Sequence, residues 1–165
     1  MPESRRLQSV QTPIIPLIAD LIRAHPGTIS LGQGVVNYGP PSAAVTEIAR
    51  FLAEPANHKY QDVSGVLPLR KVITQKLAAE NCIEVGEVHG NRLMVTAGGN
   101  QAFLNVALGI LDPGDEVILP VPYYFNHEMA ITMVNARPVL VPTDSNYQWI
   151  SELSAPRSRR APVLS

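Results

Sequence analysis

Apolar residues recur at every third or fourth position in three stretches of the first half of the chain, which is the spacing of one face of an α-helix. The first stretch, Ile14–Ile22, predicts a helix that ends before Pro26-Gly27. Ser42 is a suitable N-cap for a second helix, which is expected to reach Leu52. A third helix is predicted over Leu67–Leu77.

The second half of the chain alternates short apolar runs with helical segments. Strands are predicted at Leu93–Val95, Glu116–Pro120 and Pro138–Val141, and helices between them at Ala102–Leu111 and Tyr124–Val134. Strands that alternate with helices in this way are typical of parallel βαβ units with right-handed crossovers. The pattern therefore predicts an α/β fold.

Composition and charge restrict the kinds of protein that this chain can be. The 165 residues include 13 Lys and Arg against 14 Asp and Glu, so there is no broad basic field to bind nucleic acid or an anionic membrane. Hydrophobic residues form 45% of the sequence, unlike a disordered chain, yet no apolar run is long enough to span a bilayer. The lone Cys82 excludes an intrachain disulfide, and no signal peptide is recognisable. We expect a cytoplasmic globular protein with no nucleic-acid or membrane partner.

The turn Gly98-Gly99-Asn100-Gln101 lies where a predicted strand passes into a helix. Successive backbone N–H groups at such a turn can bind an anion, and the positive end of the helix dipole strengthens the interaction. Glycine lets the backbone approach a phosphate closely, and Gln101 can add a side-chain donor. The alternative is an ordinary βα turn in which glycine supplies a positive φ.

Three adjacent aromatic residues, Tyr123, Tyr124 and Phe125, follow the second predicted strand in a chain that is only 5% aromatic. Ligands of open parallel sheets lie beyond the carboxyl ends of the strands, so this position suggests a flat ligand that stacks on a ring. The alternative is that the rings pack the start of the next helix against the sheet. Helical geometry directs adjacent side chains differently, so only one or two of the three can face a given ligand.

Two further segments carry weaker signals. Gly32-Gln33-Gly34 can present free backbone N–H groups to a carboxylate, and Tyr60 lies in a polar loop before a helix. The sequence contains no dinucleotide-binding glycine motif, no Walker A sequence and no nucleophile elbow. No metal site is expected, because the histidines lack ligand spacing and only one cysteine is present.

Together these segments resemble the N-terminal part of the class I and II aminotransferases, which are fold-type-I, pyridoxal-phosphate-dependent enzymes, from about Pro13 to Trp149. Five pieces match in the order of the family: Ile29–Gly34, Tyr60 with Gly65 and Leu69-Arg70, Thr96–Gln101, Asp112–Val117, and Pro122-Tyr123-Tyr124. Each piece alone is common, and the order of all five carries the resemblance. It implies an incomplete α/β fold: an N-terminal arm and helices, followed by the first βαβαβ of the large domain.

The resemblance also implies a cofactor and the residues that hold it. Pyridoxal phosphate would bind through its phosphate to Gly99, Asn100 and Gln101, mostly through backbone N–H groups. Tyr124 would stack on the pyridine ring of the cofactor.

Substrates and a partner follow from the same resemblance. An amino acid and a 2-oxo acid would exchange an amino group, and Gly34 would offer its N–H to the α-carboxylate of the substrate. Active sites of this family lie at a homodimer interface, so Tyr60 would reach the cofactor phosphate of the neighbouring subunit.

The lysine that forms a Schiff base with the cofactor in this family has no counterpart among the 165 residues. The lysines present are Lys59, Lys71 and Lys76, and all three precede the phosphate turn, whereas the lysine of the family follows it. We therefore expect a truncated aminotransferase chain that contains no catalytic residue and is inactive by itself.

Three parts are expected along the chain: an arm, helix and substrate loop at residues 1–40, a partial cofactor-binding large domain at 41–149, and an unstructured tail at 150–165. Two other functions stay open. A degenerate fragment could act at most as a binding partner of an intact homologue. A small α/β protein could instead use the Gly98-Gly99 turn to bind a nucleotide or a methyl donor.

Overall fold

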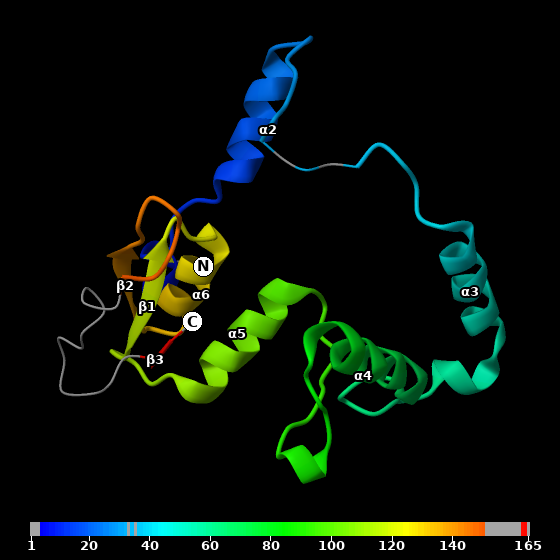
Figure 1. The fold of residues 1–165 in the computed structure, drawn as a ribbon. Helices are drawn as coiled ribbons and strands as arrows, with labels where there is room; N and C mark the ends of the chain where they lie inside the picture. The colour runs from blue at the N-terminus through cyan, green and yellow to red at the C-terminus, as the bar shows by residue number, and fades with distance from the viewer. Residues whose placement is uncertain (1–3, 33, 35, 151–162, 165) are drawn as a thin grey trace. The chain divides into compact units, whose positions relative to one another are not determined.

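The structure is a computed structural model that describes residues 4–32, 34, 36–150, 163 and 164 (Figure 1). Two compact units are present: a sheet unit of residues 1–14 and 97–165, and a helical unit of residues 15–96. The sequence predicted domain boundaries after residues 40 and 149. The limits of the two units differ from these boundaries, and the predicted domains stay a prediction.

A parallel sheet forms the centre of the sheet unit. Its strands are β1 (Glu116–Val121), β2 (Arg137–Pro142) and β3 (Val163–Leu164), in the order β2-β1-β3 (Figure 1). The helix α6 (Phe125–Met133) connects β1 to β2, and the two strands pair in register along their whole length. The βαβ unit predicted for this region is therefore confirmed.

The turn at Asp112–Asp115 joins α5 (Gly99–Ile110) to β1. The N–H of Asp115 donates to the carbonyl of Asp112 at 3.0 Å, and the carboxylate of Asp115 accepts from the N–H of Asp112 at 2.8 Å. Gly114 has a φ of +90°, which favours glycine, and its N–H donates to the carbonyl of Asn135 at 2.8 Å. The turn is thus bonded to the segment that precedes β2.

Burial of β1 produces the core of the sheet unit. Val117, Ile118 and Leu119 are only 1–4% exposed, as expected for the central strand of a parallel sheet. Val117 and Leu119 share one face of the strand, because alternate side chains of a strand point the same way. Ala107 of α5 and Ile131 of α6 belong to the same buried cluster, so both helices pack on this face.

Two predictions for the second half are wrong. Leu93–Val95 is not a strand: it is half-buried at most, and the N–H of Val95 donates to the carbonyl of Ser64 at 3.0 Å instead of joining the sheet. The next helix begins at Gly99 and not at Ala102, since Gly98 is the N-cap of α5. The α/β class stands, but the first strand of the expected βαβαβ is missing from the described sheet.

The segment expected to be an unstructured tail also differs. Its two described residues beyond Ile150 form β3, with Val117 opposite Val163 and Ile118 opposite Leu164. The other residues of that segment, 151–162 and 165, lie outside the described residues. At the other end of the chain, the expected arm contains the one-turn helix α1 (Arg5–Gln8).

The helical unit contains the three helices predicted for the first half: α2 (Ile14–Ala24), α3 (Ser42–Ala53) and α4 (Leu67–Asn81). Two short 3₁₀ turns, η1 (Pro55–His58) and η2 (Glu87–His89), complete it. Ser42 is the first helical residue and Pro41 is the N-cap, so the predicted capping role of Ser42 is wrong. No residue that the structure describes in this unit is fully buried.

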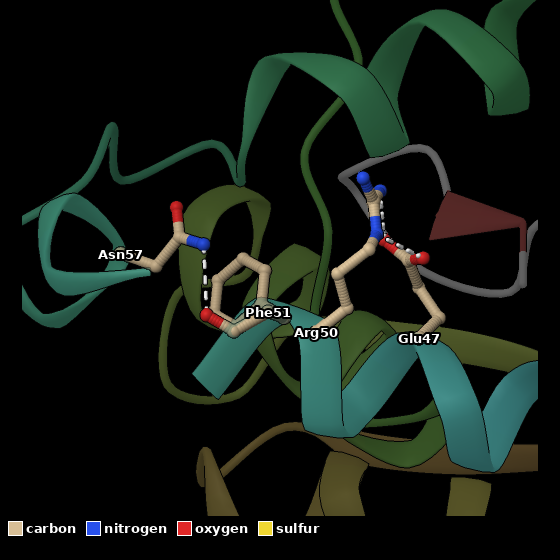
Figure 2. A network of polar contacts seen from close by, with 4 residues as sticks. All are labelled: Glu47, Arg50, Phe51 and Asn57. Carbon is tan, nitrogen blue, oxygen red and sulfur yellow. Dashed lines mark hydrogen bonds and ion pairs between the residues drawn. The ribbon is translucent and has the colours of Figure 1, made fainter. Parts of the chain in front are cut away.

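Polar contacts close the end of α3. The side-chain amide of Asn57 donates to the carbonyl of Phe51 at 2.9 Å, as Figure 2 shows, and the ring of His58 bonds the carbonyl of Leu52 at 2.8 Å. These carbonyls belong to the last turn, where carbonyl groups have no N–H donors inside the helix. One turn earlier, Arg50 and Glu47 form an exposed ion pair with two hydrogen bonds at 2.8 and 2.6 Å.

The substitution Ile131→Ala tests this core. Ile131 is fully buried, and removing a buried isoleucine side chain to alanine costs about 2–5 kcal/mol, so we expect the free energy of unfolding to fall by that amount. Leu108→Ala is the matched control, because Leu108 of α5 is 63% exposed and should change stability little. Equal losses in urea denaturation would contradict the core described here.

Candidate functional site

The phosphate turn predicted from the sequence forms the N-terminus of α5. Gly98 has a φ of +86°, and the helix begins at Gly99, so the first N–H groups of Gly99, Asn100 and Gln101 have no acceptor inside the helix. A methyl group added at Gly98 or Gly99 would meet no atom within 4 Å. The space in front of this helix end is therefore open, and the helix dipole makes it favourable for an anion.

The side chain of Gln101 has a structural task at this turn. Its Oε1 accepts a hydrogen bond from the N–H of Ala97 at 2.5 Å, which holds the turn against the first turn of α5. This resembles a capping box, in which the third helical residue bonds back to the backbone before the helix. The amide NH₂ of Gln101 is then the part of the side chain that can donate to an anion.

Tyr124 lies just after β1, where it is the N-cap residue of α6. Its ring is held from two sides: the hydroxyl accepts from the side-chain amide of Asn126 at 2.7 Å, and the edge-on ring of His127 lies 5.6 Å away. Tyr124 is nevertheless 47% exposed, so part of its surface is open to a ligand. Of its neighbours, Tyr123 packs against the buried core, as the packing alternative anticipated.

A stack of aromatic rings joins α5 to α6. The ring of Phe103 lies 4.2 Å from the ring of His127, with 16° between the planes. Phe103 follows Gly99 by one helical turn, and His127 contacts Tyr124. The predicted phosphate turn and Tyr124 thus lie at the starts of two helices of the sheet unit that this stack joins.

Gly34 and Tyr60 belong to the helical unit. Tyr60 is fully exposed, and a methyl group added at Gly34 would meet no atom within 4 Å. Their predicted roles, binding of the substrate carboxylate by Gly34 and of a partner's phosphate by Tyr60, stay predictions.

The segment after Tyr60 is organised by Gly65. Gly65 has a φ of +104°, and a Cβ at this position would lie only 2.8 Å from Cγ2 of Val95, so glycine is required for both the backbone and the space. Arg70 donates from Nε to the carbonyl of Gly65 at 3.0 Å and lies 3.7 Å from the carboxylate of Asp62. Hydrogen bonds from Ser64 are the main cause that lowers the pKa of Asp62, and Arg70 adds to it.

Residues 26–154 match the family described as Aminotransferase class I and II. This chain belongs to the class I and II aminotransferases.

Curated relatives agree with the assignment. An aromatic aminotransferase from Arabidopsis thaliana is 34% identical over 138 residues, which are 84% of this chain and 34% of that protein. An aspartate/prephenate aminotransferase from Nitrosomonas europaea is 31% identical over 150 residues, which are 85% of this chain and 35% of that protein. The chain therefore spans about a third of the length of these relatives.

Solved structures of aminotransferases share the fold. The aspartate aminotransferase of Rhizobium meliloti superposes with a TM-score of 0.82 at 26% identity, over 97% of this chain and 41% of that one. An Escherichia coli protein with a methionine aminotransferase function gives a TM-score of 0.83 at 25% identity, over 99% of this chain and 42% of that one. The chain thus has part of the fold-type-I architecture, as the sequence implied, and enzymes of this family depend on pyridoxal phosphate.

Sequence reasoning missed Phe103 and His127, whose stacked rings this aminotransferase chain places beside Tyr124, one of the residues predicted to bind the cofactor. A signal was available: His127 follows Tyr124 by three residues, and residues so spaced share a face of a helix. The contact of His127 with Phe103 was not predictable in the same way, because it joins two separate helices.

A cleft of about 950 Å³ in the helical unit is separate from these residues. It lies between α4 and residues 85–94 and is lined in part by Arg70, Lys71 and Arg92. None of the residues predicted to bind the cofactor or the substrate lines it. Among the residues that the structure describes, no three His, Cys, Asp or Glu side chains gather to hold a metal ion, and no helix could cross a membrane.

Glu128 connects the N-terminal segment to α6 and to Tyr123. Its Oε2 accepts from the hydroxyl of Tyr123 at 2.6 Å and from the side-chain amide of Gln11 at 2.9 Å. The hydrogen bond from the neutral hydroxyl raises the pKa of Tyr123, and desolvation and the negative charge of Glu128 raise it further. The bond thus fixes the residue next to Tyr124.

This contact predicts a pH dependence. Because the pKa of Tyr123 is raised above its ordinary 10.0, the stabilising bond is fully present below pH 10.0 and is lost as the pH rises through the raised pKa. We expect Glu128→Gln to lower the pKa of Tyr123, since the amide removes the negative charge. The pKa of Tyr123 is measured from tyrosinate absorbance as the pH is raised. Subtracting the titration curve of the Tyr123→Phe counterpart from that of each protein isolates Tyr123.

Glu87→Gln is the matched control. It removes the same charge as Glu128→Gln does, but from a residue of the helical unit. It should leave the titration of Tyr123 unchanged. If Glu128→Gln and Glu87→Gln gave the same titration curve for Tyr123, the assigned contact would be wrong.

Proposed function

We propose that this chain functions as part of a pyridoxal-phosphate-dependent aminotransferase, which moves an amino group between an amino acid and a 2-oxo acid. The working enzyme is a homodimer in the cytoplasm, a location that the lone cysteine supports. The relatives include aromatic, aspartate and aspartate/prephenate aminotransferases, so the candidate amino-group donors are aromatic and acidic amino acids.

One observation carries the proposal: an open helix N-terminus and a half-exposed tyrosine ring lie in the same unit, joined by a stack of rings. The open end of α5 at Gly99 has room for a phosphate, and Tyr124 offers a flat surface for a heteroaromatic ring. A phosphate attached to an aromatic ring is the ligand that fits both features.

The residues present fit pyridoxal phosphate. Backbone N–H groups of Gly99, Asn100 and Gln101 would hold its phosphate, and Tyr124 would support its ring. When bound, pyridoxal phosphate supplies the electron sink that makes transfer of the amino group possible. The contribution of these residues is to bind and orient this group.

Residues of the helical unit complete the proposal. The N–H of Gly34 would bind the α-carboxylate of the substrate, and the exposed Tyr60 would reach the cofactor phosphate of a partner subunit. The lysines of the 165 residues, Lys59, Lys71 and Lys76, all precede the phosphate turn. We therefore propose that these 165 residues alone bind pyridoxal phosphate without a covalent bond and do not transaminate.

The substitution Gly99→Asp tests the phosphate site. The new side chain has space, the φ of Gly99 is not positive, and an aspartate at a helix N-terminus favours the helix, so α5 should form normally. Its negative charge should repel the phosphate. Because a charge-assisted hydrogen bond contributes about 1.5–3 kcal/mol, we expect affinity for pyridoxal phosphate to fall about tenfold or more in equilibrium dialysis.

Gly109→Asp is the matched control, since it adds the same charge at the other end of α5, also in open space. It should bind pyridoxal phosphate as the unsubstituted chain does, and borohydride should leave no stoichiometric adduct on any of the lysines. The proposal fails if pyridoxal phosphate does not bind saturably, or if NAD or S-adenosylmethionine binds in its place. Saturable keto-acid formation by the 165 residues would refute the predicted inactivity.

A further inference from the structure

The phosphate turn and Tyr124 come from different elements of the chain. Gly99 begins α5, whereas Tyr124 precedes α6, and all of β1 lies between them in the sequence. A ligand that contacts both requires a fixed distance between them, because a displacement of about 1 Å is enough to weaken a site of this kind. Besides the packing of both helices on β1, a direct contact between them would restrain this spacing.

The stack of Phe103 on His127 is such a contact. Phe103 lies one helical turn beyond Gly99, so its position follows that of the phosphate turn. It also packs against the buried cluster that contains Leu119 and Ile131. With ring centres 4.2 Å apart and nearly parallel planes, His127 rests on a ring that is itself fixed by the core.

His127 passes this restraint to Tyr124. Its ring meets the ring of Tyr124 edge-on at 5.6 Å, and its backbone N–H donates to the carbonyl of Tyr124 at 2.9 Å. Both contacts are with the residue whose ring is half-exposed. A change in the position of His127 therefore moves Tyr124 directly.

The contacts of His127 use its ring faces and edge. Within the part of the chain that the structure describes, neither ring nitrogen of His127 has a hydrogen-bond partner. Face-to-face and edge-on contacts of this kind depend on a flat aromatic ring and not on a proton donor. A phenylalanine ring can make them equally well.

We infer that His127 is a positioning residue that acts as a spacer between the phosphate turn and Tyr124. This inference rests on the proposed function, because it assigns His127 to the pyridoxal phosphate site. The imidazole keeps the tyrosine ring at a fixed distance from α5, so that one ligand can contact both.

Two substitutions separate ring stacking from the chemistry of the imidazole. His127→Ala removes the ring, and we expect affinity for pyridoxal phosphate to fall about 3- to 10-fold, the worth of one aromatic contact, while affinity for inorganic phosphate stays unchanged. His127→Phe restores a ring, and we expect it to bind pyridoxal phosphate as tightly as the unsubstituted chain.

A readout without ligand checks that the variants fold as intended. In NMR spectra, the ring protons of Phe103 should show ring-current shifts that disappear in His127→Ala and persist in His127→Phe, because the rings stack at 4.2 Å in the unsubstituted chain. Methyl resonances of Ile131 report in the same spectra that the core is intact.

The outcomes distinguish this inference from the proposed function. If the unsubstituted chain binds pyridoxal phosphate and His127→Ala binds equally well, the positioning role is wrong and the proposed function stands. If His127→Phe loses as much affinity as His127→Ala, the ring nitrogens and not the stack are responsible, and the inference is overturned. If the unsubstituted chain shows the ring-current shifts but does not bind, the proposed function fails and the positioning role with it.

Discussion

Burial of the apolar side chains of β1 is the interaction on which the rest of the sheet unit depends. Its buried residues Val117 and Leu119 provide the surface on which α5 and α6 pack, and β2 and β3 add their hydrogen bonds on either side. Burial of an aliphatic side chain of this size contributes about 1.5–3 kcal/mol, more than most single polar contacts. The positions of the two helix starts proposed to bind the cofactor follow from this packing, because Gly99 begins one helix and Tyr124 precedes the other.

The helical unit is stabilised differently. Its described residues include none that is fully buried, and the apolar faces of α2 and α3 remain largely exposed at residues such as Leu17, Ile48 and Leu52. Order within this unit comes from local polar contacts, such as those of Arg70 with Gly65 and Asp62. Exposed ion pairs contribute little free energy, so the helical unit gains far less from its contacts than the sheet unit does.

Local patterns in the sequence predicted most of the helices and strands, but not the contacts between distant segments. Periodicity predicted the helices and the parallel pair of β1 and β2, because a hydrophobic face or run is a local property of the sequence. Leu93–Val95 shows the limit of this reasoning, since an apolar run becomes a strand only where a partner strand is available, and Val95 bonds Ser64 instead. The sequence analysis placed Gly99 and Asn100 in a turn before a helix that starts at Ala102. In the structure they form the first turn of α5, where the N–H of Ala97 bonds the side chain of Gln101.

Long-range contacts could not be predicted from the sequence, because no local pattern specifies which distant segments meet. The short strand β3 lies in a segment whose prolines, arginines and serines show no strand pattern, and its place beside β1 is a tertiary contact. Of the candidate site, glycines after a predicted strand and aromatic residues after β1 singled out Gly99–Gln101 and Tyr124, whose binding roles stay predictions. The stack of Phe103 on His127, which links them, joins two helices whose packing no local pattern specifies.

Amide hydrogen exchange measured residue by residue on the 165-residue chain tests the central claim most directly, namely that the buried strand β1 and its two helices hold in place the residues proposed to bind the cofactor. We predict that the slowest-exchanging amides are those of β1, α6 and the second half of α5, and that the amides of α2, α3 and α4 exchange much faster, because slow exchange reports burial and cooperative packing. Equal protection of α2, α3 and β1, or fast exchange throughout β1, would contradict it.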